Sequence, residues 1–165
     1  MPKQVDLDKT YLKMAETWGQ LSKARRKKVG CLIVKNGAII SDGYNGTPRG
    51  FHNNCETEVP RTDVFPNIVV DDDGNFVEGT YNLTTKPEVL HAESNAITKL
   101  AKSTQSSEDS TMYITISPCV DCSKLIIQSG IKRVVFGELY RNDKGVKLLK
   151  KANIEAVQHI SPIQK

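Results

Sequence analysis

The sequence predicts a layered α/β fold built on a mixed sheet that begins with a hairpin. Stretches with apolar residues at helical spacing alternate with short β-rich runs, in the order α-β-β-α-β-α-β-α-β along 165 residues. The two early strands follow one another directly, whereas a helix separates each later strand from the next, as in crossover connections. We find no internal repeat or linker, so residues 1–165 are expected to form a single domain.

The first part of the chain predicts one helix and one hairpin. Apolar residues recur at helical spacing after Asp6 and Asp8, which can cap a helix start. Further on, Asn36 and Gly37 separate two β-rich runs, and this dipeptide is a strong hairpin signal. The expected elements are a helix over about 8–22 and antiparallel strands near 29–34 and 38–44.

Residues 52–88 interrupt this regular pattern. The turn-rich stretch "GTPRGFHNNCETEVPRTD" leads into them, and "NIVVDDDGNFVEG" predicts a small hairpin around Asp73 and Gly74. A connection this long inside a compact domain usually has a function. We therefore expect an inserted loop and hairpin excursion here.

The last part of the chain alternates helices and strands. Pro118 at the start of one helical stretch and Gly130 after its last turn match the usual asymmetry of helix ends. The expected elements are a helix from about His91 to Lys102, a strand in "TMYITIS", a helix in "SPCVDCSKLIIQSG", a strand in "KRVVFGE", a helix over 144–152 and a strand in "IEAVQHI".

Composition excludes several classes of protein. Hydrophobic residues make up 38% of the chain and charged residues 25%, and no apolar run approaches the length of a membrane span. The N-terminal stretch is too polar for a secretory signal, which predicts a cytoplasmic protein. In a reducing compartment its four cysteines indicate core residues, metal ligands or reactive thiols rather than disulfides.

A basic run, "SKARRKK", directly follows the first helix. It places Lys23, Arg25, Arg26, Lys27 and Lys28 close together in a chain whose net charge is only +4. Such a run is either a solvated loop or a contact for phosphate or nucleic acid. Composition does not choose between these.

Cys119 and Cys122 form a CxxC pair at the start of a predicted helix. Their sulfurs share one face, and a helix N-terminus favours the thiolate form that a metal needs. The pair alone also fits a redox site or one edge of a structural zinc cluster. No second CxxC is present, which argues against a four-cysteine cluster.

His91 begins another predicted helix, and Glu93 follows two residues later. Alone, the tripeptide also fits an ordinary exposed helix start. Together with the two cysteines, His91 completes a three-ligand zinc site that leaves one position open, as in catalytic sites. Glu93 can then take a proton from water that zinc has activated and return it to a ring nitrogen and to leaving ammonia. The combination of H-x-E with P-C-x-x-C is typical of zinc nucleobase deaminases.

With these motifs the chain resembles the deoxycytidylate (dCMP) deaminases of the cytidine deaminase-like superfamily, especially those of bacteriophages and higher organisms. The resemblance runs from about Tyr11 to Ile160 and rests on "GYNGTPRG", "HAESNAI", "SPCVDCSKLIIQSGIKRVVF" and Tyr140. It implies a three-layer α-β-α cytidine deaminase-like fold with a mixed five-stranded sheet. It also implies hydrolysis of dCMP to dUMP and ammonia, which supplies thymidylate synthesis.

The resemblance assigns roles to individual residues. One Zn²⁺ would be held by His91, Cys119 and Cys122, while Glu93 would move protons during attack on carbon 4 of the cytosine. Asn45 would contact the sugar, although a plain turn residue in "YNG" explains it equally well. The substrate phosphate needs cations or hydrogen-bond donors, and the expected substrate-binding residues are Lys23, Arg25, Arg26, Ser117 and Tyr140.

Regulation is a further implication of the resemblance. Members of this branch are activated by dCTP with Mg²⁺ and inhibited by dTTP at a separate site around the "GYNG" loop. Here that site would comprise Gly46, Arg49, Gly50 and Asn53. A surface turn with a solvated arginine is the alternative. The branch also implies a homohexamer.

Departures from the family pattern bear on the zinc count. Some phage relatives bind a second, structural zinc, but Ala24 stands where one of them may have a cysteine ligand, and His52 with Cys55 only faintly resembles the remainder of that site. We therefore expect one zinc per chain.

Three rival interpretations use the same residues. An RNA or single-stranded DNA deaminase shares both zinc motifs, but it needs stacking aromatics and these make up 6% of the chain, so nucleic acid is not an expected partner. A free-nucleoside deaminase would leave the basic run without a ligand. A non-enzymatic zinc module would close the fourth metal position with His52, Cys55 or His159.

Overall fold

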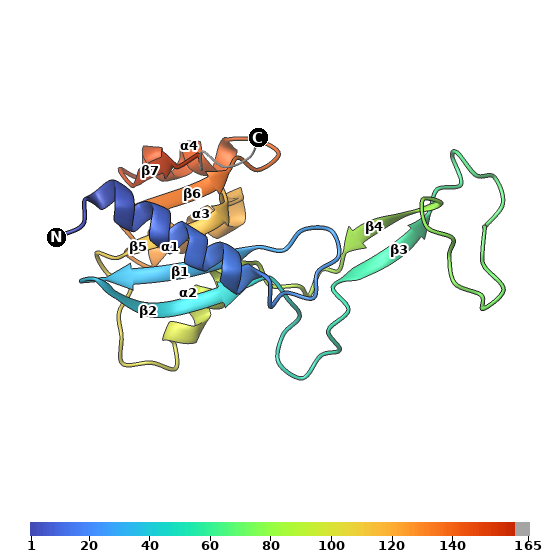
Figure 1. Cartoon of the computed structure of the whole chain (residues 1–165), viewed down its shortest axis with the longest axis horizontal. Coiled ribbons are helices and arrows are strands. Elements are labelled where there is room, and N and C mark those ends of the chain that lie inside the picture. The colour runs from blue at the N-terminus through green and yellow to red at the C-terminus, as the bar shows by residue number, and fades with distance from the viewer. Residues whose placement is uncertain (161–165) are drawn as a thin grey trace.

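A computed structural model of the chain, which describes residues 1–160, has a five-stranded sheet at its centre (Figure 1). In spatial order the strands are β2 (Ala38–Tyr44), β1 (Gly30–Lys35), β5 (Thr111–Ile116), β6 (Arg133–Glu138) and β7 (Glu155–Gln158). β1 pairs antiparallel with β2 and β5, whereas β5 with β6 and β6 with β7 are parallel pairs. The predicted mixed sheet opened by a hairpin is therefore confirmed.

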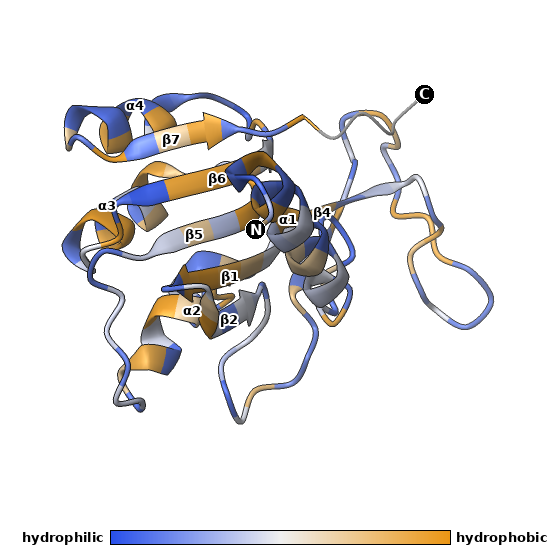
Figure 2. Ribbon diagram, turned by 60° about the vertical axis from the view of Figure 1, so that its left-hand side comes forward, coloured by the Kyte–Doolittle hydropathy of each residue, from blue (hydrophilic) through white to orange (hydrophobic). Residues whose placement is uncertain are grey.

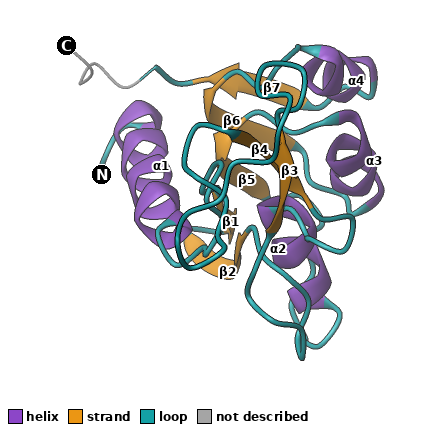
Figure 3. Cartoon of the chain, turned by 90° about the vertical axis from the view of Figure 1, so that its right-hand side faces the viewer, coloured by secondary structure: helices purple, strands orange, loops and turns teal. Residues whose placement is uncertain are grey.

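Helices cover both faces of this sheet, which makes three layers (Figure 3). They are α1 (Gln4–Gly19), α2 (Ala92–Leu100), α3 (Val120–Gln128) and α4 (Lys144–Lys151). α1 packs through Leu12 and Ala15 on one face, and the other three helices cover the opposite face. Gly43 lets the start of α2 approach β2, because a Cβ there would lie 2.1 Å from the carbonyl oxygen of Ala92.

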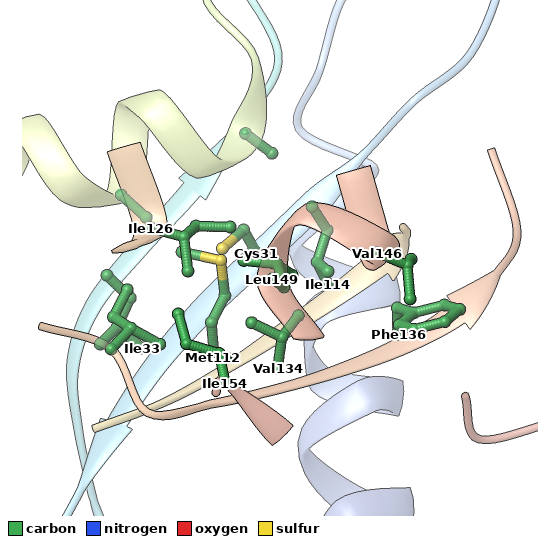
Figure 4. Packing of buried hydrophobic residues seen from close by; sticks show 13 residues of the cluster. Cys31, Ile33, Met112, Ile114, Ile126, Val134, Phe136, Val146, Leu149 and Ile154 are labelled. Atoms are coloured by element: carbon green, nitrogen blue, oxygen red, sulfur yellow. The ribbon is translucent and has the colours of Figure 1, made fainter. Parts of the chain in front are cut away.

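The larger part of the core lies between the sheet and helices α2, α3 and α4 (Figure 4). Ile33, Met112 and Val134 project from the sheet toward Ile126 and Leu149 of the helices. Cys31 is fully buried among them and behaves as a small apolar residue. Within residues 1–160 no helix combines the length and apolar character that crossing a membrane requires.

The predicted capping of α1 by Asp6 and Asp8 is wrong. The helix begins four residues earlier than expected, with Lys3 at its cap position. Asp8 lies inside the helix with 5% exposure, and both of its carboxylate oxygens accept hydrogen bonds of 2.8 Å from Arg133 of β6. A partner 125 positions away along the chain thus determines the role of Asp8, which helix-end statistics do not detect.

The excursion differs in detail from its prediction. Its ladder joins β3 (Glu56–Pro60) to β4 (Tyr81–Thr85) in a separate two-stranded sheet, and around Asp73 and Gly74 only the isolated bridge between Val70 and Phe76 forms. The apolar run before Asp71 forms no longer ladder, and Asp71 uses its Oδ1 to accept from the amides of the turn. We call residues 56–85 the arm and residues 61–80 its tip; the arm projects away from the body (Figure 1).

Candidate active site

Two helix starts bring the predicted zinc ligands together. His91 is the N-cap residue of α2 and Cys119 that of α3, while Cys122 lies in the first turn of α3. The His91 Nδ1 atom is 3.7 Å from the Cys119 sulfur and 3.3 Å from the Cys122 sulfur. All three donor atoms lie within 4.8 Å of one another.

The donor set and its spacing fit zinc. Usual zinc–sulfur and zinc–nitrogen bond lengths at a tetrahedral angle place sulfur and nitrogen about 3.6 Å apart, close to the observed separations. Hydrogen bonds from Cys122 and His91 lower the pKa of the Cys119 thiol, which favours the thiolate that a metal binds. In residues 1–160 the cluster consists of these three, and His52, Cys55 and His159 do not join it. Structural zinc sites usually have four protein ligands, so a cluster of three argues against a closed structural site.

Glu93 lies in the first turn of α2, beside the zinc ligands, but is not one of them. It is 4% exposed, and burial raises the pKa of its carboxyl to about 7, although His91 opposes this shift. A carboxyl that titrates near neutral pH can both accept and release a proton. The arrangement therefore supplies a proton carrier next to a metal site.

A cavity of about 320 Å³ connects the cluster with the basic run. Its wall includes most of the predicted substrate-binding residues, and also two cations and two carboxylates that the sequence did not single out for this role. The predicted members are Arg26, Asn45, Ser117 and Tyr140, and the additional charged members are Lys27, Arg141, Glu56 and Glu138.

Residues 5–138 match the protein family described as the cytidine and deoxycytidylate deaminase zinc-binding region. The chain belongs to this family. Among its relatives, the deoxycytidylate deaminase of Enterobacteria phage T4 is 37% identical over 153 residues, covering 82% of this chain and 79% of the phage protein. The Saccharomyces cerevisiae deoxycytidylate deaminase is 34% identical over 92% of this chain, which corresponds to 44% of the yeast protein.

Solved structures agree with this assignment. The dCMP deaminase of cyanophage S-TIM5, in complex with dCMP and dUMP, superimposes with a TM-score of 0.77 at 39% identity, over 96% of this deaminase and 100% of the phage chain. This similarity confirms the predicted cytidine deaminase-like fold. The diaminohydroxyphosphoribosylaminopyrimidine deaminase/5-amino-6-(5-phosphoribosylamino)uracil reductase of Thermotoga maritima is 23% identical over 94% of this chain and 37% of its own, and it shares the fold at a TM-score of 0.64.

The cations of the basic run lie in different parts of the deaminase. Arg26 lines the cavity, and its guanidinium donates to the Thr85 hydroxyl at 3.2 Å. Arg25 instead turns to the arm, where it pairs with Glu58 at 2.6 Å and donates to the Tyr81 hydroxyl at 2.7 Å. Lys23 lines a neighbouring cavity. Sequence proximity alone therefore did not distinguish these three cations.

Asn45 and Ser117 shape the cavity wall through their hydrogen bonds. The Asn45 side chain accepts a hydrogen bond from the Val29 amide and donates one to the Lys27 carbonyl, both at 2.8 Å. These two bonds hold the backbone at the end of the basic run in place. The Ser117 hydroxyl accepts from the Tyr140 amide at 2.7 Å and holds that residue at the cavity. Both residues thus position neighbours as well as line the site.

A second cavity of about 230 Å³ lies on the other side of Asn45. Of the four residues expected to bind an effector nucleotide, Gly46 and Asn53 line it, whereas Arg49 and Gly50 do not. Lys23 and Lys99 also lie on its wall, and Lys99 forms a partly exposed ion pair with Asp42. Lys99 lies on α2, and the "GYNG" motif gave no indication that this helix contributes to the second cavity.

Proposed function

We propose that this deaminase converts dCMP and water into dUMP and ammonia, a step that supplies thymidylate synthesis. The observation that carries the proposal is a single cavity. Its wall includes His91, Cys119 and Glu93 at the zinc site, and it also includes three cations: Arg26, Lys27 and Arg141. Three cations near a nucleobase site suit a substrate that carries a phosphate. The similarity to deoxycytidylate deaminases of phage T4 and cyanophage S-TIM5 supports the same substrate.

The residues of this chain divide the reaction between them. His91, Cys119 and Cys122 would hold Zn²⁺, which when bound supplies the Lewis-acid chemistry that makes water nucleophilic near neutral pH. Glu93 accepts one proton from the attacking water and gives it to ring nitrogen N3. It then carries the remaining proton of the new hydroxyl on carbon 4 to the amino group, so that the carbon–nitrogen bond breaks, ammonia leaves and the carbonyl of dUMP forms. Its burial keeps bulk water from competing for that proton.

The phosphate end of the substrate is assigned to Arg26 together with Tyr140. Arg26 offers donors on the cavity wall without a carboxylate partner in the described part of the chain. Lys27 pairs with Glu138 at 2.7 Å, but both side chains are more than half exposed, so a phosphate can compete for this lysine. Asn45 is assigned to the sugar of the substrate. Its side chain also bonds the backbone of Lys27 and Val29 in the cavity wall.

The loss of ultraviolet absorbance of cytosine tests the proposal, with dCMP, CMP, deoxycytidine and dCTP as parallel substrates. Turnover of dCMP well above that of the other three is expected. Preference for deoxycytidine would mean that the cations do not bind a phosphate. No turnover of any monomer by the zinc-loaded protein would favour a polynucleotide substrate, which a labelled single-stranded DNA or tRNA assay would detect.

Regulation is proposed at the second cavity, with dCTP and Mg²⁺ as activator and dTTP as inhibitor. Gly46 and Asn53 allow a nucleotide to approach, and Lys23 and Lys99 supply charge for a triphosphate. The Mg²⁺ would enter with the dCTP. The expected rate curve for dCMP is sigmoidal and becomes hyperbolic when dCTP is added, whereas a hyperbolic curve unaffected by dCTP and dTTP would contradict the proposal.

Assembly and metal content complete the proposal. We infer a homohexamer with one zinc per chain, acting in the cytoplasm, or in the host cytoplasm if the chain is phage-encoded. Ala24 and Cys55 both line the main cavity, where Ala24 offers no ligand atom for a second metal. Metal analysis that finds two zinc ions per chain would contradict this count.

A further inference from the structure

The tip of the arm has no partner within the described part of its own chain. At the base, Glu56 accepts from the amides of Arg25 and Arg26, and the side chain of Arg25 bonds Glu58 and Tyr81. Beyond Pro60, every hydrogen bond found for residues 61–80 stays within that segment. The arm is thus anchored at one end and projects from the body at the other (Figure 1).

Large apolar side chains are exposed on this tip. Five of them are between 36% and 61% exposed, and Figure 2 shows the corresponding hydrophobic stretches on the projecting loop: Val64, Ile68, Val69, Val70 and Val77. A two-stranded sheet by itself is marginally stable in water, and clustered exposed apolar residues mark interaction surfaces. The tip therefore has the character of a surface that another molecule covers.

Charge indicates what kind of molecule covers it. The tip has five carboxylates against the single guanidinium of Arg61, a formal charge of −4, whereas the rest of the chain carries +8. Within residues 1–160 none of these carboxylates forms an ion pair: Asp63, Asp71, Asp72, Asp73 and Glu78. A second copy of this chain offers the complementary positive surface.

Helix α4 of such a copy presents a positively charged surface. It buries Val146 and Leu149 against the core, while four lysines remain exposed: Lys144, Lys147, Lys150 and Lys151. In the described residues only Lys147 is paired, with Asp143 at 3.0 Å. We call these four lysines the α4 lysine face.

The positions of the two surfaces suit a contact between the tip of one copy and α4 of another. Figure 1 shows the tip and α4 toward opposite ends of the long axis, so the arm is far from α4 of its own chain. In a pair of copies whose long axes run in opposite directions, each tip would lie toward the α4 end of the other copy. A two-fold axis would make this contact occur twice. Opposite charges on the two surfaces would then fix this register.

We propose that the tip of each arm binds the α4 lysine face of a neighbouring copy of this chain. The interface holds whether or not the substrate is dCMP, but it rests on the homo-oligomer proposed above and specifies one of its contacts.

Reciprocal charge reversal, followed by molar mass from light scattering, tests this interface. The arm variant changes Asp63, Asp72 and Asp73 to Lys and keeps Asp71, whose Oδ1 accepts from two amides of the turn. The α4 variant changes Lys144, Lys150 and Lys151 to Glu and keeps the pair of Lys147 with Asp143. A control variant changes the exposed lysines of the α1 end to Glu: Lys3, Lys9 and Lys13.

Each single-surface variant should show at least a halving of molar mass, because like charges then face each other. The combined variant should regain the mass of the unchanged protein, and the control should keep it. Circular dichroism and zinc content, equal in all variants, show that loss of mass is not loss of folding. The regained mass of the combined variant is the decisive check if one surface alone impairs folding.

The outcomes separate the two proposals. Unchanged mass in either single-surface variant, or failure of the combined variant to reassemble, would overturn the contact between the tip and α4. A monomeric unchanged protein would overturn the homo-oligomer as well. Neither result would bear on dCMP turnover, which the absorbance assay measures independently.

Discussion

Replacing Arg26 with alanine should weaken the use of dCMP and leave deoxycytidine turnover unchanged. Arg26 lines the cavity, and within residues 1–160 only the Thr85 hydroxyl bonds its guanidinium, so its other donors remain available for a phosphate. A hydrogen bond to a charged group contributes about 1.5–3 kcal/mol. The kcat/KM for dCMP should therefore fall by roughly 10- to 150-fold.

The matched control is Arg25→Ala, next to it in the sequence. Arg25 is held by Glu58 and Tyr81 outside the cavity wall, and exposed ion pairs contribute little to stability. Its kcat/KM for dCMP should stay near that of the unchanged enzyme. Absorbance assays with dCMP and deoxycytidine give both ratios. Equal losses on the two substrates, or a larger effect of Arg25→Ala, would refute the assignment of the phosphate to Arg26.

Three further changes have defined outcomes. Glu93→Gln should lower kcat by roughly 10²- to 10⁴-fold with zinc content unchanged by metal analysis; loss of zinc would instead indicate a structural role. Chelation should abolish deamination and added Zn²⁺ should restore it, whereas full activity of a metal-free sample would refute the metal site. Asp8→Asn should destabilise the fold by about 3 kcal/mol in urea unfolding, because it leaves Arg133 without its buried partner. Burial raises the pKa of Asp8, but hydrogen bonds from Arg133, Gln4 and Tyr113 outweigh it and lower the net value. The contribution of Asp8 is thus complete above its unfolded pKa of about 3.9 and is lost as the pH falls through the lower folded value. A stability difference between variant and parent that does not shrink as the pH is lowered below about 3.9 would contradict this.

The sheet was predictable because its signals are local. Asn36 and Gly37 specify the turn between β1 and β2, and apolar runs in the second half mark β5 and β6. The arm was harder, since β3 and β4 contain few apolar residues and a pairing between positions 56 and 85 leaves no local mark. The local turn at Asp73 and Gly74 does form, with an antiparallel bridge between Val70 and Phe76, but the prediction missed the longer ladder between β3 and β4.

The candidate site shows the same division. His91, Glu93, Cys119 and Cys122 were recognisable because each lies at or just after a helix start, where spacing along the chain fixes direction. The sequence did not show which cations line the cavity, because the direction of a side chain on a loop depends on the partners that distant parts of the chain offer. The second cavity likewise gained Lys99 from a helix that the loop motif does not include.

The sequence by itself determined the order of helices and strands, the zinc ligands and the family to which the chain belongs, since these depend on spacings of a few residues. Only the tertiary structure decided that Arg26 rather than Arg25 lines the cavity, that the Asn45 side chain bonds the backbone of the cavity wall, and that the tip of the arm projects without a partner among residues 1–160. These features depend on contacts between residues far apart in the chain, and such contacts exist only once the sheet, its helices and the arm have come together.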